Sequence, residues 1–403
     1  MRNYIAEILK GNRGYQTKED IPAVGVILQH LKRIVFCFKG SLLENAILIY
    51  ICFFYYMLTF VVGAFLGHRI TAKIDFYYFI FFQYFIAFFF LLWSAETIYY
   101  LIKNLDMGFS GIPLIWSSSR KKYLNKETIS RFLVIYSIIP LFMCSYCSLK
   151  QTIPLFHKFS FDIFLYNLDK AIHFHHSPWE ILHPILGHPI ITRIIDFSYL
   201  AWGSIFVYSM LYMACHKDRR LRLQFFISLS LCWVVIGNLL AILLASAGPC
   251  YFSEVTGVTP SPYAGLFEYL RSIPDLKVVF NQELLWRAFK AGIYMPLGGI
   301  SAMPSMHVSI AVLLALLYRN FNRWAGWLLT VFAIVIGVGS IHLGWHYAID
   351  GYVSTLLTIL IWNAVGACFR KGVRCREKSQ HSFPEGTVRI DLDSGKEDNE
   401  PQH

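Results

Sequence analysis

Two histidines and an aspartate stand four residues apart in the stretch GSIHLGWHYAIDG, residues 339–351. Residues four apart lie on one face of an α-helix, so His342, His346 and Asp350 are expected to share a helical stripe. An aspartate one turn from a histidine can accept a hydrogen bond from its Nδ1–H, which fixes the tautomer and leaves Nε2 free. The spacing therefore predicts an oriented histidine that acts as a nucleophile or as a ligand.

A second polar element lies about 40 residues upstream, in the stretch GGISAMPSMHVSIAVLLALL. Pro304 and Ser305 open an apolar, helix-like run, and His307 falls in its first turn. Backbone N–H groups at the start of a helix attract phosphate, and the hydroxyl of Ser305 adds a donor. Both stretches begin at the same predicted membrane face, so we expect the histidines, the carboxylate and a phosphate site to converge there.

These residues could also have a structural role and no catalytic one. Ionisable groups inside a membrane are costly, and a His346–Asp350 pair could be a structural element of a transporter. His307, which follows Pro-Ser on the same face, favours catalysis instead. For His342, packing is the first interpretation, and a role as an accessory donor is the second.

The composition is that of a polytopic membrane protein. Of 403 residues, 56% are hydrophobic and 15% are charged, and the mean hydropathy is +0.48, whereas soluble domains carry about 25% charged residues. The formal net charge of +11 comes mainly from lysines and arginines in short loops and tails. This distribution indicates membrane topology and not nucleic-acid binding.

A helix that crosses the hydrocarbon core needs about 20 apolar residues. The sequence predicts an all-α integral membrane protein with about eight such helices, the last six forming a catalytic core within 131–369. Two N-terminal spans and a loop occupy 42–130, a basic leader occupies 1–41, and a tail expected to be disordered occupies 370–403. The candidate spans are 42–66, 75–102, 130–149, 194–215, 224–247, 302–318, 324–342 and 346–369.

Lysine and arginine are concentrated in alternate loops, which the positive-inside rule makes cytoplasmic together with both termini. The opposite side carries the long loops 150–193 and 248–301, whose amphipathic segments are expected to fold over the outer mouth of the bundle. The first apolar run, near Leu42, is too long for a cleaved signal peptide. Because the stretches that carry His307 and His346 begin at this opposite side, the catalytic residues are expected at the outer face. The basic segments are 1–40, 120–131, 217–222, 319–323 and 370–378.

No metal, cofactor or disulfide is predicted. Cys250 is the only one of nine cysteines in a predicted outer loop, so it has no obvious partner. A group of histidines in the first long loop raises the possibility of zinc, but their spacing matches no closed site and no Asp or Cys ligands gather around them. We interpret this segment as interfacial. Its histidines are His173, His175, His176, His183 and His188.

The motifs PSMH and GSIHLGWHYAID together resemble those of the type 2 phosphatidic acid phosphatase superfamily. GISAMPSMH, GWHYAIDG and GPCYF (residues 248–252) are similar to its inositolphosphotransferase branch, which includes inositol phosphorylceramide synthases. The similarity spans roughly residues 160–365. HPILGHPIITRIIDFSYLAW resembles bacterial members of that branch, so the resemblance implies a bacterial inner-membrane protein with its site on the periplasmic or lumenal face.

The resemblance implies a role for each motif residue. His346 is the nucleophile that forms a phosphohistidine, and Asp350 orients it. His307 protonates the departing oxygen and then serves as a base on the acceptor. Ser305 binds phosphate, and Tyr251, within GPCYF, is expected to contact the substrate.

The sequence also departs from the superfamily pattern. The Lys-x6-Arg-Pro element is absent, and Ser340 stands where an arginine is found in the broad superfamily. The missing positive charge must come from elsewhere, and Arg287 and Lys290 are the candidates, although both could be ordinary contacts to lipid headgroups. The loss is more tolerable for a phosphodiester than for a monoester, because the diester carries less charge.

The expected activity is transfer of a phosphorylated, inositol-phosphate-like headgroup from a lipid donor to a lipid hydroxyl, as in sphingolipid synthesis. Metal is not required, because positioning and charge neutralisation suffice for phosphoryl transfer. Two alternatives stay open: a lipid phosphate phosphatase that uses the same residues, and a transporter or scaffold without catalysis. The oligomeric state is not predicted.

Overall fold

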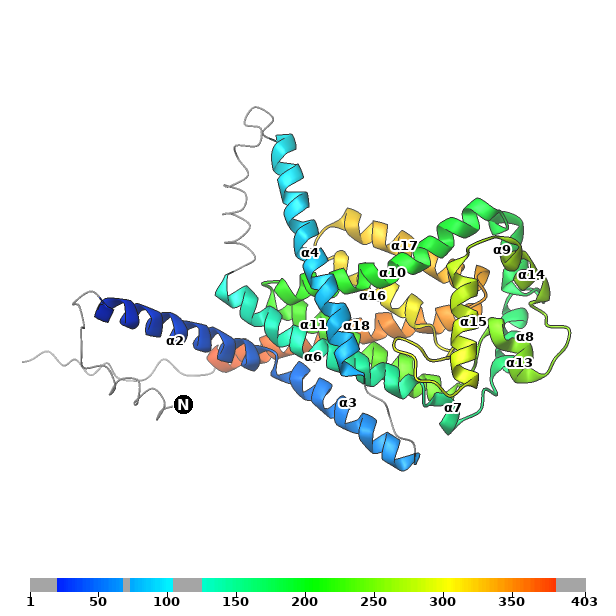
Figure 1. Ribbon diagram of the computed structural model, residues 1–403, viewed down its shortest axis with the longest axis horizontal. Coiled ribbons are helices and arrows are strands. Elements are labelled where there is room, and N and C mark those ends of the chain that lie inside the picture. The colour runs from blue at the N-terminus through cyan, green and yellow to red at the C-terminus, as the bar shows by residue number, and fades with distance from the viewer. Residues whose placement is uncertain (1–19, 68–72, 104–124, 382–403) are drawn as a thin grey trace, which may run out of the picture.

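The computed structural model describes residues 20–67, 73–103 and 125–381. All regular secondary structure within these ranges is helical (Figure 1), which confirms the predicted all-α class. Residues 1–19 of the predicted leader, residues 104–124 of the loop after the second predicted span, and the tail after residue 381 lie outside the described residues. The part of the expected disordered tail that is described, residues 370–381, is helical and continues α18.

Within the described ranges, seven helical segments are long and apolar enough to cross a membrane. Their number and composition make this an integral membrane protein. One of them is interrupted by a π-helical stretch, Cys232–Leu240, between α11 (Arg219–Leu231) and α12 (Ala241–Leu243). The segments are α3 (Ala46–Phe65), α4 (Ile74–Lys103), α6 with α7 (Lys126–Phe156), α10 (Pro189–Cys215), α11 to α12 (Arg219–Leu243), α17 (Arg323–His342) and most of α18 (Ala348–His381).

The predicted span 302–318 is shorter than expected. Its helix, α16, covers Met306–Tyr318 and has 13 residues, because the chain before Met306 is not helical. At 1.5 Å per residue this helix is about 20 Å long, less than the roughly 30 Å of a hydrocarbon core. The predicted span 302–318 therefore contains a helix of only about two-thirds the thickness of the hydrocarbon core, and this helix packs against α17 and α18 inside the bundle.

Helix α2 (Asp20–Glu44) occupies the second half of the predicted leader and breaks at Asn45 before α3 begins. It is tied to the bundle through Arg222 of α11, whose side chain is fully buried. The Arg222 guanidinium donates to Glu44 Oε2 at 2.8 Å and to the carbonyl oxygen of His216 at 2.7 Å. This contact joins α2 to the bundle at the end where α11 starts.

The outward faces of the long helices are apolar. Phe54 on α3, Phe197 on α10 and Leu328 on α17 are 70%, 69% and 67% exposed, respectively. Such a surface would be a liability in water, but it matches lipid tails, which are as apolar as the side chains themselves. The interior mixes packed aromatic residues with buried serine, threonine and asparagine side chains.

Short helices cover the end of the bundle at which α17 ends and α18 begins (Figure 1, right). This cap confirms that the two long predicted loops contain amphipathic helices. Asp196 of α10 ties the cap to the bundle, because its carboxylate accepts hydrogen bonds from Lys277 N and Val278 N at 2.9 Å each. The cap helices are α8 (Asp162–Ile172), α9 (Pro178–Leu186), α13 (Phe252–Thr256), α14 (Ala264–Ser272) and α15 (Lys277–Lys290).

Candidate active site

The stretch that carries the two spaced histidines is not one helix. α17 ends at His342, and α18 begins at Ala348. Between them Gly344 adopts a left-handed backbone conformation, with φ of +72°, a common way for a chain to leave an α-helix. The expected single helical stripe is therefore wrong: His342 closes one helix, His346 lies in the turn, and Asp350 lies in the first turn of the next.

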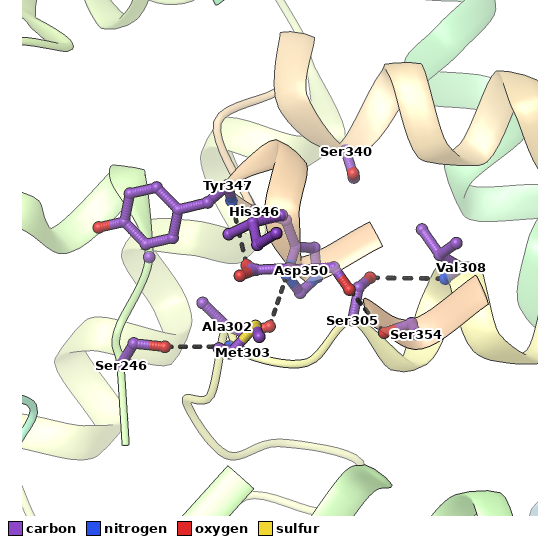
Figure 2. A network of polar contacts seen from close by, with 12 residues as sticks. Ser246, Ala302, Met303, Ser305, Val308, Ser340, His346, Tyr347, Asp350 and Ser354 are labelled. Carbon is purple, nitrogen blue, oxygen red and sulfur yellow. Dashed lines mark hydrogen bonds and ion pairs between the residues drawn. The ribbon is translucent and has the colours of Figure 1, made fainter. Parts of the chain in front are cut away.

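The pairing of His346 with Asp350 is nevertheless present (Figure 2). His346 Nδ1 lies 3.2 Å from Asp350 Oδ2 and 2.8 Å from the carbonyl oxygen of Ala302. Both neighbours can only accept while Asp350 is ionised, so Nδ1 carries the proton and donates it. Asp350 Oδ2 also accepts from Tyr347 N at 3.0 Å. The unprotonated nitrogen of His346 is then Nε2.

Hydrogen bonds hold the segment before α16, residues 302–305, to Ser246 on one side and to Asp350 on the other. Ala302 N donates to the carbonyl oxygen of Ser246 at 2.9 Å, and Met303 N donates to Ser246 Oγ at 3.0 Å. Ser305 N donates to the carbonyl oxygen of Asp350 at 3.3 Å. This segment therefore links the start of α16 directly to the His346–Asp350 pair, as Figure 2 shows.

His307 lies in the first turn of α16 and faces His346, with 6.2 Å between the two ring centroids. Its imidazole packs against Tyr199 and Trp202, whose ring centroids are each 4.5 Å away. Trp202 Nε1 donates to the carbonyl oxygen of His307 at 3.0 Å. The aromatic pair fixes the position of the second histidine across from the first.

Both histidines line one cavity of about 540 Å³. Its polar end carries these imidazoles with an ammonium, an amide and hydroxyls, and its other end is walled by apolar and aromatic side chains. The polar end includes Lys150, Tyr251, Asn281, Ser301, His307 and His346, and the apolar walls include Ile80, Phe81, Met143, Phe206, Val207 and Trp233.

A protein-family model described as the PAP2 superfamily matches residues 163–364, half of the chain. The chain belongs to the PAP2 superfamily. Membership supports activity of the lipid phosphatase or phosphotransferase type, and the matched segment contains His307, His346 and Asp350. No curated protein and no solved structure matches the chain.

Two further predicted PAP2 site residues are engaged in the fold. Ser305 is fully buried and caps α16: its Oγ accepts from Val308 N at 3.4 Å, and it does not line the cavity. Tyr251 does line the cavity, and its hydroxyl donates to the carbonyl oxygen of Gln282 at 2.8 Å. Binding of phosphate by Ser305 or of substrate by Tyr251 stays a prediction.

Ser340 is the residue that the resemblance places where the broad superfamily has an arginine. It is buried, and its Oγ donates to the carbonyl oxygen of Gly337 at 2.7 Å. Its own carbonyl oxygen accepts from Trp345 N and His346 N at 2.9 and 3.2 Å. Ser340 therefore anchors the turn that carries His346 and supplies no charge to the cavity.

Lys150, the last residue of α6, is the only lysine or arginine among the described residues that line the cavity. No carboxylate in the described part of the chain forms an ion pair with it. The loop that covers it passes very close, because a Cβ on Gly299, where φ is +108°, would lie 3.1 Å from Lys150 Cγ. Lys150 is thus a basic side chain without a carboxylate partner in the described residues, and it lines the same cavity as the two histidines.

Arg287 and Lys290, the expected sources of positive charge, lie outside this cavity. Both belong to the exposed face of α15. The Arg287 side chain is 79% exposed and pairs with Glu283 at 3.3 Å, and Lys290 Nζ lies 5.4 Å from the centre of the Trp286 ring. An amphipathic cap helix turns its basic side away from the bundle, so neither residue is brought to the histidines.

His342 is buried away from the cavity. Its Nε2 lies 2.9 Å from Thr192 Oγ1, which also contacts the hydroxyl of Tyr269 at 2.8 Å. Its ring stacks at 6.4 Å on that of His183. This geometry favours the interpretation of His342 as a packing residue. In the part of the chain that the structure describes, no group of three or more His, Cys, Asp or Glu side chains is arranged to hold a metal ion.

Two buried carboxylates of α8, Asp162 and Asp169, hold the site in place. Asp162 accepts from Gly248 N and from the hydroxyl of Tyr347, each at 2.8 Å. Asp169 accepts from Ala348 N and from the next backbone N–H, at 2.7 and 2.9 Å. Burial raises the pKa of both carboxyl groups above the ordinary value of aspartate, while these hydrogen bonds oppose the shift.

The close approach of two loops explains the glycine in GPCYF. Gly248 has φ of +98°, and a Cβ on it would lie 2.6 Å from the carbonyl oxygen of Trp345. Only glycine allows this conformation and this contact without strain. Gly248 therefore lets the segment held by Asp162 pack directly against the turn that carries His346.

Sequence patterns gave no motif for Lys150, Asp162 or Asp169, although each carries a signal. Lys150 directly follows an apolar span at the predicted outer face, whereas the Lys- and Arg-rich segments that define the positive-inside pattern lie at the other face. Asp162 and Asp169 are seven residues apart, which places them on one helical face in a loop expected to be interfacial. Charged residues at such positions are candidates to point into the protein and not toward solvent.

Proposed function

We propose that this PAP2-superfamily protein is a membrane phosphotransferase that moves a phosphorylated headgroup from a lipid donor to a lipid hydroxyl through a phosphohistidine on His346. One observation carries the proposal. The two acceptors at Nδ1 of His346 leave Nε2 as its nucleophilic nitrogen, in a cavity where the ring of His307 lies 6.2 Å away. A tetrahedral phosphorus between the rings would meet a nucleophile on one side and an acid on the other.

In the first half-reaction, His346 Nε2 attacks phosphorus and forms a P–N bond. The P–O bond to the lipid alcohol breaks, and protonated His307 gives its proton to the departing oxygen. Asp350 stabilises the positive charge that develops on the imidazole of His346. The products are a free lipid alcohol and a headgroup phosphate held on His346, with His307 neutral.

In the second half-reaction, His307 takes the proton of the incoming hydroxyl as that oxygen attacks phosphorus. The P–N bond breaks and returns the electron pair to His346 Nε2. With a lipid alcohol as acceptor the product is a new phospholipid, and with water it is the free headgroup phosphate. Acid and base functions therefore alternate on one residue, as microscopic reversibility requires.

The single cation favours a phosphodiester as substrate. A diester carries one negative charge, whereas a phosphate monoester carries about −1.5 to −2 near neutral pH. Lys150 neutralises one charge, and Ser340 supplies none where other superfamily members place an arginine. This match supports headgroup transfer over simple removal of phosphate. Inositol phosphate as the headgroup and ceramide as the acceptor follow from the resemblance of GISAMPSMH and GWHYAIDG to inositolphosphotransferases.

The test is a product assay in reconstituted vesicles. Phosphatidylinositol with tritiated inositol is supplied together with ceramide or diacylglycerol, and a parallel reaction contains phosphatidic acid. We expect tritium in a new lipid. Release of inorganic phosphate from phosphatidic acid without any headgroup transfer would assign the phosphatase alternative. Absence of every reaction that depends on His346 would leave the transporter or scaffold alternative.

We also propose that the site opens at the outer, periplasmic or lumenal, face and that both termini are cytoplasmic. The support is the charge pattern: α11 and α17 begin beside the basic segments 217–222 and 319–323, at the end opposite the cap. A bacterial inner membrane is the location expected from the similarity of residues 183–202 to bacterial proteins.

A pair of exposed positions tests the orientation. Arg287→Cys on the cap and Asn320→Cys at the other end are each compared with the unsubstituted protein in intact cells. A membrane-impermeant maleimide should label the first variant before permeabilisation and the second only afterwards. The opposite order would reverse the proposed topology.

A further inference from the structure

The cavity continues well beyond the two histidines. Its lining residues follow three helices away from the capped end: Lys150 back to Met143 on α6, Tyr77 to Tyr84 on α4, and Trp202 to Val207 on α10. At 1.5 Å per residue, the seven-residue steps on α4 and α6 each cover about 10 Å. The three runs enclose one chamber that extends from the histidines into the bundle.

The chamber has one charged end and an apolar body. Lys150 is its only lysine or arginine among the described lining residues, and it stands at the level of the histidines. Farther in, Phe81, Met143, Phe206 and Trp233 form the walls, and each is at most 6% exposed. This layout matches a molecule with one anionic group joined to a hydrocarbon chain.

We propose that this chamber binds the hydrocarbon chain of the lipid substrate and thereby selects its length. The inference rests on the proposed function, since it assigns the chain of the lipid whose phosphorus lies at His346. The charged end receives the phosphate, and the chain lies between α4, α6 and α10, parallel to the helices. A bilayer lipid then keeps its chain in apolar surroundings when it enters the site.

The wall formed by α4 lies outside the segment that matches the PAP2 family, residues 163–364. It is nevertheless joined to the site. The hydroxyl of Tyr77 accepts from Leu297 N at 3.2 Å, in the loop that covers Lys150. The hydroxyl of Tyr84 lies 3.2 Å from Ser204 Oγ on α10. In the proposed arrangement α4 contributes to substrate selection, while the matched segment supplies His307, His346 and Asp350.

A second apolar groove offers a rival position for a chain. It measures about 450 Å³ and lies between α16, α17 and α18. Val308 and Gly351 line it, and neither His307 nor His346 does. A chain in this groove would be separated from the histidines by α16 and α18, so we place the substrate chain in the chamber.

Two glycines give matched substitutions for the chamber and the groove. Gly203 of α10 lines the chamber, and Gly337 of α17 lines the groove. At both positions a new Cβ would meet nothing within 4 Å. Leucine favours helix over glycine, so neither Gly203→Leu nor Gly337→Leu should impair folding. Each leucine simply occupies space in its own cavity.

The experiment measures turnover of dipalmitoyl and dihexanoyl phosphatidylinositol. In Gly203→Leu the ratio of long-chain to short-chain kcat/KM should fall about tenfold or more, because each methylene that no longer fits a pocket has an effect of this size. In Gly337→Leu the ratio should equal that of the unsubstituted protein. An unchanged ratio in Gly203→Leu, or a shift confined to Gly337→Leu, would overturn the proposal.

A binding measurement separates this proposal from the proposed function. In the His346→Ala background, phosphatidylinositol with a diazirine in its acyl chain should label residues 77–84 when irradiated. Adding Gly203→Leu should abolish that labelling, and adding Gly337→Leu should not. Labelling with no turnover by the unsubstituted protein would contradict the proposed function alone. Turnover that depends on His346, without labelling of residues 77–84, would contradict the chamber alone.

Discussion

Replacement of His346 by alanine should reduce headgroup transfer by at least about 10⁴-fold, since loss of a covalent nucleophile has an effect of this order or larger. Alanine removes Nε2 and therefore the P–N bond on which both half-reactions depend. Binding of the donor should change little, because Lys150 and the apolar chamber are intact. The measurements are single-turnover transfer in vesicles and donor binding by the same preparation.

The intermediate itself gives a direct readout. Donor labelled with tritium in the inositol and with radioactive phosphorus should leave both labels on the unsubstituted protein in an acid-labile form. Loss of tritium with retention of phosphorus would indicate that a bare phosphoryl group is transferred. His346→Ala should retain neither label.

His342→Ala is the matched control for this prediction. It removes the same kind of side chain from the same stretch, but His342 contacts Thr192 and does not line the cavity. We expect it to keep transfer within about tenfold of the unsubstituted protein, with a modest loss of stability because the buried imidazole leaves a cavity. Full activity in His346→Ala, or equal inactivation by both changes, would rule out His346 as the nucleophile.

Lys150→Met should reduce kcat/KM for a phosphodiester donor by about 10²- to 10³-fold, the usual effect of removing one preorganised group that stabilises transition-state charge. Methionine keeps the length and the apolar stem of lysine while it removes the ammonium. Lys150 is unpaired in the described structure, so the loss reports on the substrate and not on a broken ion pair. Steady-state kinetics with a water-dispersed short-chain donor provides the measurement.

Lys290→Met is the control for Lys150→Met. It makes the same chemical change on α15, where Lys290 lies over Trp286 outside the cavity. Its kcat/KM should stay within about threefold of the unsubstituted value, as expected for an exposed surface charge. A larger loss of kcat/KM in Lys290→Met than in Lys150→Met would instead indicate that the phosphate binds at the basic face of α15.

The residues expected to do the chemistry were accessible from sequence because their relation is local. Asp350 follows His346 by four residues, and this short separation brings the carboxylate to Nδ1 even though a helix starts between them. His307 was indicated by its place at the start of an apolar run. Such relations depend on a few backbone angles and survive errors in the position of a helix boundary.

The cation could not be assigned in the same way. Lys150 lines the same cavity as the histidines because α6 packs against the loop around Gly299, nearly 150 residues later in the chain. Arg287 and Lys290 are nearer in sequence to His307, and for that reason they were expected to supply the positive charge at the site. Helix α15 crosses the cap with its basic face outward, and no local pattern specifies that rotation. The same holds for Asp162 and Asp169, whose partners lie 85 or more residues away.

Membranes differ in thickness, and long helices adjust to them by changing their tilt. A site divided between two independent helices would lose its geometry whenever those helices slid past each other. Here the carbonyl of Ala302 fixes the ring of His346, and the same short segment runs on through Ser305 to His307. One segment of backbone thus connects the proposed nucleophile to the proposed acid, so a tilt of α16 or α18 should move both residues together and preserve their spacing.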